Sequence, residues 1–421
     1  MVVESWLVRA ARERPARAAV NDVTYADLLE RARGVAAGLP RGARVGLALA
    51  PGEDYVVALH GCLLAGALVV PIDLRLTEAE RPEVDVLLED AKPFTPVRFE
   101  SADEQHDLDA PAILVHTSGT TSAPKPIRLT YGNWLWSALG SAVALGVDPD
   151  ERWLCTLPLS HVGGLSILLR SAIYGTTAVV HERFETQRVL QALQQPDGPT
   201  VVSLVPTTLA RLLDAGLQDP PALRWALLGG APLPPALIAR AEAAGVRVAP
   251  TYGLTEACSQ VATAGVPLFC TRVVLDPADG EILVSGPTLS PDARTDEDGR
   301  LHTGDLGAFD DDGLLRIVGR KADTIVTGGE NVAPAEVEAV LEAHPAVAEA
   351  GVLARPDDEW GEAVVALVRL REGATATALD LQDHARAHLA RFKVPKDVVV
   401  TADPLPRTAS GKLVRRDLRF P

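Results

Sequence analysis

Residues 223–256, LRWALLGGAPLPPALIARAEAAGVRVAPTYGLTE, contain the pattern that decides the fold. An apolar, strand-like run over Leu223–Leu228 leads into GGAPLP and then into a helical stretch at about Pro234–Ala244. A second strand-like run, Val246–Ala249, leads into TYGLTE, which we expect to be a loop. Strands that alternate with helices in this way predict a mostly parallel sheet with helical crossovers.

The same alternation occurs earlier in the chain, where a strand at Thr200–Leu204 precedes a helix that begins near Pro206, a favoured first helical residue. Further expected elements are a helix at Tyr25–Leu39, a strand at Ala43–Leu49, a helix at Asp54–Ala65 and a strand at Ala112–Val115. The polar segment Leu76–Asp109 carries no pattern that places it. We therefore predict an α/β fold with layered, mostly parallel sheets and helices.

A second domain is expected after residue 319, because 421 residues exceed what one hydrophobic core usually supports. The stretch DDDGLLRIVGR, which ends at Arg320, predicts a tight turn between two strands. Pro334 then opens an amphipathic helix, and AGVLA and AVVALVRL look like strands. The predicted domains are 1–319 and a small α+β domain at 320–421, whose last residues form a loop and a basic helical end.

Charge and cysteine usage restrict the partners and the compartment. The formal net charge of −16 argues against binding to nucleic acid. The four cysteines form no CxxC pair and are expected to be buried free thiols in a reducing compartment. The N-terminal residues lack the apolar core of a signal peptide, and the apolar stretch Ala58–Ile72 is too short to span a bilayer. We expect a cytoplasmic protein without a transmembrane segment.

Glycine- and hydroxyl-rich segments point to a phosphate ligand. In a parallel sheet, ligands bind beyond the carboxyl ends of the strands, so GGAPLP and TYGLTE are expected at one edge. HTSGTTSAPKP, residues 116–126, offers hydroxyls and backbone amides that suit phosphate oxygens, and Lys125 adds a point charge. An ordinary polar turn is the alternative. The segment is not a Walker A loop, and no GxGxxG motif is present.

Three further side chains fit the same kind of ligand. Glu256 is suited to coordinate Mg²⁺ beside phosphate oxygens, and Thr255 to donate to the same phosphate. A loop glutamate is, however, more often simply solvated. Asp305 in HTGDLG can accept hydrogen bonds from both ribose hydroxyls, although an aspartate after glycine more often shapes a turn.

Six motifs occur in one order along the chain: SGTTSAPK, PLSHVGGL, YGLTE, TGDLG, GRKADTIVTGGENVAPAEVE and PRTASGK. Together they resemble those of the acyl-adenylate-forming, AMP-binding enzymes over roughly residues 20 to 420. The resemblance implies a large N-terminal domain that binds ATP and a carboxylic acid, and a small, mobile C-terminal domain. It implies that the acid is activated as an acyl-AMP and is then transferred to a thiol.

The resemblance also assigns residues to the ligands. The triphosphate loop is Thr117, Ser118, Gly119, Thr120, Thr121 and Lys125. Adenine is held by Gly229, Gly230, Ala231 and Tyr252, and the ribose by Asp305 and Arg320. The implied catalytic residues are Thr255 at the α-phosphate, Glu256 at Mg²⁺ and the mobile lysine Lys412. Gly328 and Gly329 lie beside the pantetheine tunnel for coenzyme A.

The acid is implied to lie near His161, Gly163 and Gly164, where the glycines leave room for a flat aromatic ring. A packing role for His161 is an equal alternative. Ser259 and Gln260 are further candidates to contact a substrate carboxylate.

The chain departs from the family pattern at three residues and in two segments. Ser122 and Pro126 replace glycines of the triphosphate loop, which predicts less loop flexibility and a changed ATP affinity. Ala322 stands where the family has a hinge Asp or Lys. The region before the first motif and the stretch from residue 253 to 305 are short for the family, which predicts a changed coenzyme A entrance or dimer surface.

The stretches LPLSHVGGLSILLRSAIYGTT, TYGLTEACSQ and GGENVAPAEVEAVLEAHPAVAEAGV most resemble the o-succinylbenzoate–CoA ligase branch, which acts in menaquinone biosynthesis. The hypothesis is therefore an ATP- and Mg²⁺-dependent acid–thiol ligase with coenzyme A as co-substrate. Another acyl- or aryl-CoA ligase is the first alternative. A stand-alone adenylation enzyme that charges a carrier protein is the second, with SHVGG arguing against an amino acid. A regulatory protein without catalysis is disfavoured by Lys412 and Glu256. A homodimer is left open.

Overall fold

The computed structural model describes residues 1–91, 104–117, 125–407 and 413–420. Its central feature is a nine-stranded sheet in the order β16-β15-β14-β13-β12-β10-β11-β2-β3, parallel from β14 through β2. Its strands are β2 (Ala18–Val20), β3 (Val23–Thr24), β10 (Arg152–Cys155), β11 (Thr177–Val180), β12 (Val201–Leu204), β13 (Trp225–Leu228), β14 (Val248–Leu254), β15 (Ser259–Thr263) and β16 (Val266–Pro267). The predicted α/β class with mostly parallel sheets is confirmed.

A second sheet has the order β6-β4-β5-β8-β9 and is parallel except for β9. It consists of β4 (Arg44–Leu47), β5 (Leu68–Pro71), β6 (Val86–Leu88), β8 (Pro111–Thr117) and β9 (Lys125–Thr130). A short pair, β1 (Val2–Glu4) and β7 (Gln105–Asp107), lies near the N-terminus.

Helices bury the faces of these sheets in two cores. The larger core joins both sheets through α1 (Trp6–Glu13), α2 (Tyr25–Ala36), α3 (Glu53–Leu64), α4 (Tyr131–Leu145) and α5 (Val162–Tyr174). The smaller one packs α6 (Thr186–Leu193), α7 (Pro206–Asp214) and α8 (Pro235–Ala243) on β10, β12 and β13. The loops at the carboxyl ends of the central strands are thereby held on a rigid, helix-covered sheet.

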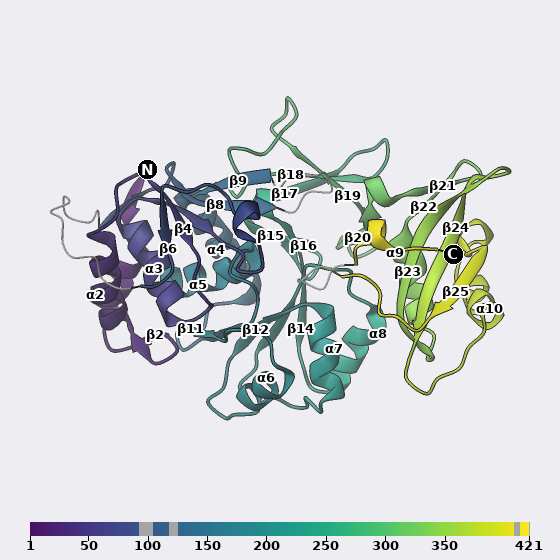
Figure 1. Ribbon diagram of the computed structural model, residues 1–421, viewed down its shortest axis with the longest axis horizontal. Helices are drawn as coiled ribbons and strands as arrows, with labels where there is room; N and C mark the ends of the chain where they lie inside the picture. Colours follow the sequence, from purple (N-terminus) through teal and green to yellow (C-terminus); the bar gives the residue numbers. More distant parts are fainter. Residues whose placement is uncertain (92–103, 118–124, 408–412, 421) are drawn as a thin grey trace.

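Two further sheets follow along the chain (Figure 1). The first is antiparallel and contains β17 (Arg272–Leu275), β18 (Glu281–Ser285), β19 (Leu301–Phe309) and β20 (Leu315–Arg320) in that order. The last forms one end of the molecule, in green to yellow, and contains β21 (Ile325–Thr327), β22 (Glu330–Val332), β23 (Val347–Asp357), β24 (Gly361–Leu370) and β25 (Asp397–Thr401). Its core includes α9 (Pro334–Glu342) and α10 (Ala378–His388). The boundary between residues 319 and 320 stays a prediction.

The predicted alternation is present as β12, α7, β13, α8 and β14, and the strands pair in parallel. One expectation was wrong: most of TYGLTE is strand. Strand β14 pairs in parallel with β13 up to Pro250 and then continues to Leu254 as the antiparallel partner of β15. The strand thus extends past the edge where its parallel partner ends.

Two other expectations need correction or completion. The basic C-terminal end is a single 3₁₀ turn, Arg415–Asp417, and not a longer helix. The segment that carried no pattern contains β6 and β7, which are only three residues each and too short to show a period. Among the described residues, no helix is long and apolar enough to cross a bilayer. Cys62, Cys155 and Cys258 are buried free thiols, whereas the free thiol of Cys270 is half-buried.

Candidate functional site: an adenylate site at the end of the parallel sheet

Three residues assigned to the nucleoside contact one another directly. The Tyr252 hydroxyl donates to Asp305 Oδ2 at 2.8 Å, and Arg320 Nε lies 2.6 Å from Asp305 Oδ1. Burial first, and then the adjacent Asp305 carboxylate, raise the pKa of Tyr252, so its hydroxyl stays protonated and donates. Asp305 is only 6% exposed, and both of its oxygens are engaged. We call these three residues the nucleoside cluster.

A β-bulge aims Asp305 at its partners. Strand β18 pairs with β19 on both sides of Ile282, which leaves Thr303, Gly304 and Asp305 opposite that one residue. Gly304 has a φ of +71°, a conformation that favours glycine. Bulges of this kind redirect side chains near functional sites.

The adenine-side turn lies against β14. Gly229 directly follows β13, and a Cβ atom at this residue would lie 2.6 Å from Thr251 Oγ1, the neighbour of Tyr252. Gly230 and Ala231 continue the same turn. The structure therefore brings the predicted turn next to the strand that carries the nucleoside cluster's tyrosine.

The catalytic candidates Thr255 and Glu256 form a short 3₁₀ turn at the end of β14, and this turn contacts β9. The Glu256 carbonyl accepts from the Ser290 amide at 2.8 Å, while its carboxylate forms no hydrogen bond or ion pair with any described residue. A half-buried carboxylate with its oxygens unengaged is suited to a cation. Over the described ranges, no group of three or more His, Cys, Asp or Glu side chains could hold a metal ion unaided. Mg²⁺ commonly takes one or two carboxylates and completes its shell with phosphate and water.

Much of the predicted triphosphate loop lies outside the described residues, namely Ser118, Gly119, Thr120, Thr121 and Ser122, and so does Lys412. The two ends of the loop are described: Thr117 pairs with Lys125 between β8 and β9, and Thr117 Oγ1 donates to the Lys125 carbonyl at 3.3 Å. Pro126 is exposed within β9. The base of the loop is thus a β-hairpin whose second strand contacts the Thr255–Glu256 turn.

The acid-side candidates lie at the start of α5. His161 is the residue that precedes the helix, and its half-buried ring lies near Asp73 and Arg75. Burial is the main cause that lowers the pKa of His161, which favours the neutral ring. Packing alone requires glycine at residue 164, because a Cβ atom there would lie 2.5 Å from the Pro158 carbonyl oxygen. Beside Gly163 the nearest atom is a Leu157 methyl carbon at 3.3 Å.

Ser259 and Gln260 begin β15, which packs against both α4 and α5. Gln260 is buried, and its Nε2 donates to Thr263 Oγ1 at 2.9 Å, while its Oε1 is buried without a partner among the described residues. The structure thus places the second pair of acid candidates on the element that faces the helix carrying the first group.

Arg170 is a residue that the sequence analysis missed. It lies on α5, is 2% exposed, and donates through Nη2 to Ser137 Oγ at 3.1 Å. Ser137 in turn donates to the Cys258 carbonyl, directly before Ser259. Its guanidinium carbon also lies 5.7 Å from the centroid of the Trp153 ring, whereas among the described residues no carboxylate pairs with Arg170 and its buried Nε has no hydrogen-bond partner. The available signal was a single charge in an otherwise apolar helix, VGGLSILLRSAIY.

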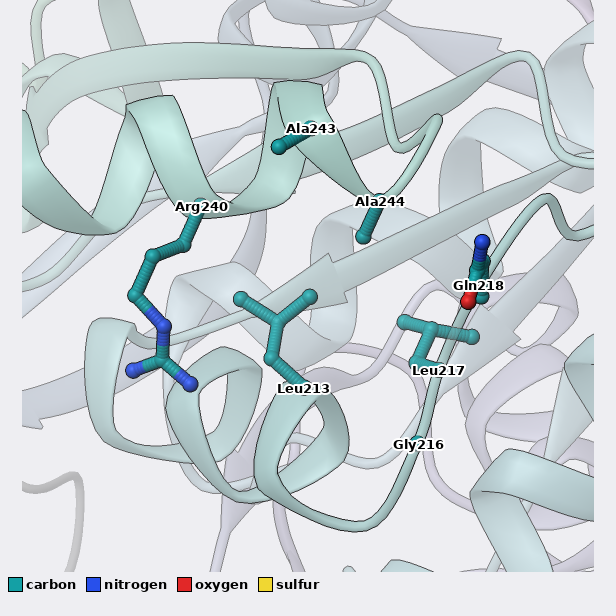
Figure 2. Close-up of a pocket in the computed structure, with 7 residues that line it drawn as sticks. All are labelled: Leu213, Gly216, Leu217, Gln218, Arg240, Ala243 and Ala244. Atoms are coloured by element: carbon teal, nitrogen blue, oxygen red, sulfur yellow. The ribbon is translucent and has the colours of Figure 1, made fainter.

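The two predicted glycines of the pantetheine tunnel, and a pocket that was not predicted, lie away from these residues. Gly328 and Gly329 form the turn between β21 and β22, where the Gly328 amide donates to the Trp360 carbonyl at 2.8 Å. This turn belongs to the C-terminal sheet, away from β12 and β14 (Figure 1). A pocket of about 320 Å³ between α7 and α8 is lined by none of the predicted site residues, and Figure 2 shows Leu213 and Arg240 on its walls. Its Arg240 is paired with Asp214 at 2.6 Å.

Matches to known protein families assign the chain to an enzyme class. Residues 7–94 and 82–291 match the AMP-binding enzyme family, and residues 336–412 match the AMP-binding enzyme C-terminal domain. The chain belongs to the AMP-binding enzyme family.

Particular relatives are similar over the whole chain. The 2-succinylbenzoate–CoA ligase of Bacillus subtilis strain 168 is 36% identical over an alignment 479 residues long, which covers 99% of this chain and 97% of the relative. The Bacillus licheniformis enzyme of the same name is 36% identical over 477 residues, with 98% and 99% covered. The solved structure of Bacillus subtilis o-succinylbenzoate coenzyme A synthetase in complex with AMP superposes with a TM-score of 0.90 at 33% identity, covering 100% of this chain and 99% of that one.

Proposed function

We propose that this protein is an o-succinylbenzoate–CoA ligase: ATP and the acid give acyl-AMP and pyrophosphate, and coenzyme A then gives the acyl-CoA and AMP. The carrying observation is the nucleoside cluster at the end of a parallel sheet, in a chain that matches such ligases over nearly its full length. The structure of the Bacillus subtilis synthetase in complex with the acyl-adenylate intermediate, with a TM-score of 0.87, supports the two-step chemistry. The pathway served is menaquinone biosynthesis.

The residues present fit ATP and Mg²⁺. Each oxygen of the buried Asp305 carboxylate can accept a further hydrogen bond, from a ribose hydroxyl, besides its contact with Tyr252 or Arg320. The Glu256 carboxylate has no partner among the described residues. We propose that Asp305 and Arg320 hold the ribose, that Tyr252 stacks on adenine, and that Gly229, Gly230 and Ala231 border the base. Glu256 would hold Mg²⁺, which when bound neutralises phosphate charge. The related synthetase with ATP and magnesium has a TM-score of 0.89 and 33% identity.

Attack of a carboxylate on the α-phosphate brings two anions together, so positioning and cationic compensation supply most of the catalysis. The proposed contributors are Thr255 as a donor to the α-phosphate and Lys412 as the cation between the acid and the phosphate. The loop Thr117 to Lys125 holds the β- and γ-phosphates, and Gly328 and Gly329 border the pantetheine arm. The thiol then attacks the activated carbonyl, so the mechanism requires no protein nucleophile.

Arg170 is suited to the second carboxylate of this acid. o-Succinylbenzoate carries two carboxylates, so one stays anionic when the other is activated. A guanidinium that is 2% exposed and has no acidic partner among the described residues is costly unless an anion compensates it. We propose that Arg170, which is linked through the Ser137 hydroxyl to the Cys258 carbonyl beside Ser259, stabilises the unreacted carboxylate.

The decisive experiment measures pyrophosphate release with o-succinylbenzoate, with and without coenzyme A. A burst without coenzyme A and steady turnover with it are expected, because the acyl-AMP stays bound until a thiol arrives. Benzoate, succinate and a panel of aryl acids are the comparison acids. Faster turnover with another acid would replace o-succinylbenzoate, and turnover only with an added carrier protein would support the alternative adenylation enzyme.

The role of Lys412 has its own test. Lys412→Ala is expected to lower pyrophosphate release about a thousandfold, because one cation at the reacting phosphate is lost. Thioester formation from supplied acyl-AMP should be spared, and equal loss of both steps would contradict the assignment. A cytoplasmic location and a homodimer stay predictions, the second open to sedimentation measurement.

A further inference from the structure

Glu281 is a buried carboxylate behind the nucleoside cluster, and no step of the proposed chemistry uses it. It is 4% exposed, at the first position of β18. Its Oε1 accepts from the backbone amide of Gly304 at 2.8 Å. Its Oε2 accepts from Lys321 Nζ at 3.0 Å and lies 3.2 Å from His302 Nδ1. Glu281 therefore contacts the residue before Asp305 and the residue after Arg320.

The contact with Gly304 bears on the direction of the Asp305 side chain. A β-bulge leaves its extra residues outside the ladder, so their amides need other acceptors. Glu281 satisfies the Gly304 amide, and Thr303 Oγ1 accepts from the Asp305 amide at 3.1 Å. The turn that aims Asp305 is thus fixed by a charged acceptor, which makes a stronger hydrogen bond than a neutral one.

The contact with Lys321 bears on Arg320. Lys321 Nζ is held between Asp279 Oδ2 at 2.5 Å and Glu281 Oε2 at 3.0 Å. Burial raises the pKa of Glu281, but Lys321, the Gly304 amide and His302 outweigh it and lower the pKa overall, so the carboxylate is charged at neutral pH. A fixed Lys321 restricts the end of β20, from which Arg320 reaches Asp305.

We infer that Glu281 is a positioning residue for the ribose site: through the Gly304 amide it holds Asp305 where the ribose hydroxyls bind. The inference rests on the proposed nucleotide site and names a residue outside it. Glu281 touches no substrate, so its removal changes how well the enzyme distinguishes the ribose hydroxyls and does not remove a reacting group.

The test compares ATP with 3′-deoxy-ATP in pyrophosphate release, and AMP with 3′-deoxy-AMP in equilibrium binding. Wild type is expected to prefer the nucleotides that carry the hydroxyl, because Asp305 accepts from it. Glu281→Ala should reduce this preference by about tenfold, the effect of one misplaced charge-assisted hydrogen bond. The change should appear mainly as a higher KM for ATP, with kcat much less affected.

Glu281→Gln is the conservative variant, because its amide oxygen can still accept from Gly304. It should retain most of the preference and guards against a Glu281→Ala protein that folds poorly. Asp279→Asn is the comparison variant, since it weakens the Lys321 contact, can still accept from the Glu281 amide and leaves the Gly304 bond intact. Its preference should therefore change much less than that of Glu281→Ala. A purely structural role would lower the active fraction of all variants equally and leave the preference ratio unchanged.

Two outcomes overturn the inference. The first is an unchanged ratio in both Glu281 variants while Asp305→Ala abolishes the preference, which leaves the nucleotide site standing and removes Glu281 from it. The second is an unchanged ratio in Asp305→Ala itself, which refutes the ribose assignment and the positioning role together.

Discussion

The nucleoside side and the acid side of the proposed site differ in whether their buried charged side chains have a counter-charge. On the nucleoside side, Asp305 is neutralised by Arg320 and hydrogen-bonded by Tyr252 before any ligand arrives. On the acid side, the partners of buried Arg170 among the described residues are the Ser137 hydroxyl and the Trp153 ring, with no carboxylate, and Gln260 Oε1 has none. On the proposed assignment, the nucleoside side is preorganised, and the acid side would be completed by the substrate carboxylate.

The largest expected effect comes from a substitution on the nucleoside side of the site. Asp305→Ala removes the acceptor for both ribose hydroxyls and should raise the KM for ATP by about two orders of magnitude. The KM for the acid should change little, because α5 and β15 are untouched. Initial rates of pyrophosphate release measure both constants. Asp310→Ala, at the far end of the same β19–β20 hairpin, is the control and should leave both unchanged.

A smaller effect is expected on the acid side. Arg170→Gln should raise the KM for o-succinylbenzoate about thirtyfold, because a buried charge no longer meets the free carboxylate. The KM for ATP should stay within about twofold of wild type. A monocarboxylic analogue should lose much less affinity than the diacid. Equal losses for both acids would place the second carboxylate elsewhere.

The stability of the ligand-free protein sharpens the comparison, because the two sides should respond with opposite signs. Arg170→Met removes an uncompensated buried charge and should raise the free energy of unfolding by about 1 kcal/mol. Asp305→Ala removes a compensated one and should lower it by about 1 kcal/mol. Denaturant titration without ligands measures both. Two changes of the same sign would contradict the distinction.

The smallest expected effect tests whether a buried ionisable side chain without a full counter-charge also occurs far from the site. Burial, above all, raises the pKa of Glu342 in α9 to about 7, while the Ala350 amide and Arg407 only partly oppose it. The folded protein then holds a proton that the unfolded chain releases above about pH 4.5. This contribution to stability is present below that pH and is lost as the pH rises through about 7. Glu342→Gln should flatten melting temperature against pH in this window.

Glu349→Gln is the matched control for the pH test. Burial raises the pKa of Glu349, but Arg369 and the Leu405 amide outweigh it, so the pKa is lowered overall. A lowered pKa gives stability that is lost as the pH falls, so the main change in this variant should lie at acidic pH. A smaller change is expected near pH 7, because the Glu349 charge is one of the causes that raise the pKa of Glu342. A Glu342→Gln curve that keeps the wild-type slope between pH 4.5 and 7 would contradict the assigned cause.

The alternation of strands and helices from β12 to β14 could be predicted because each element has its own hydrophobic period and its own turn residues. The end of β14 could not. Tyr252 to Leu254 follow the last residue paired with β13, and glycine and threonine there are typical of a loop. Their strand conformation depends on β15, which begins at Ser259 after a turn and enters through positive φ at Cys258 and Ser259. Pairing with a later segment is not encoded in local propensity.

The sequence motifs named the residues expected to touch ligands, but not those that support them. Asp305 and Arg320 are visible as motif residues, whereas Glu281 acts through a hydrogen bond to Gly304, more than twenty residues away. Arg170 is conspicuous only against its apolar neighbours in the sequence, and once no carboxylate is found beside it in the described part of the chain. Such roles follow from three-dimensional pairing and burial, which a single sequence does not display.

One hairpin, β14 and β15, carries Tyr252 on its first strand and Gln260 on its second, with Gly253 opposite Gln260. If Tyr252 binds the base and Gln260 the acid, as proposed, changing the length of either strand would disturb both at once. In the proposed site, helix α5 carries acid-side residues and none of the nucleoside cluster. An enzyme of this architecture can therefore acquire a new acid most safely by substitutions on α5, while the hairpin keeps the nucleotide in place.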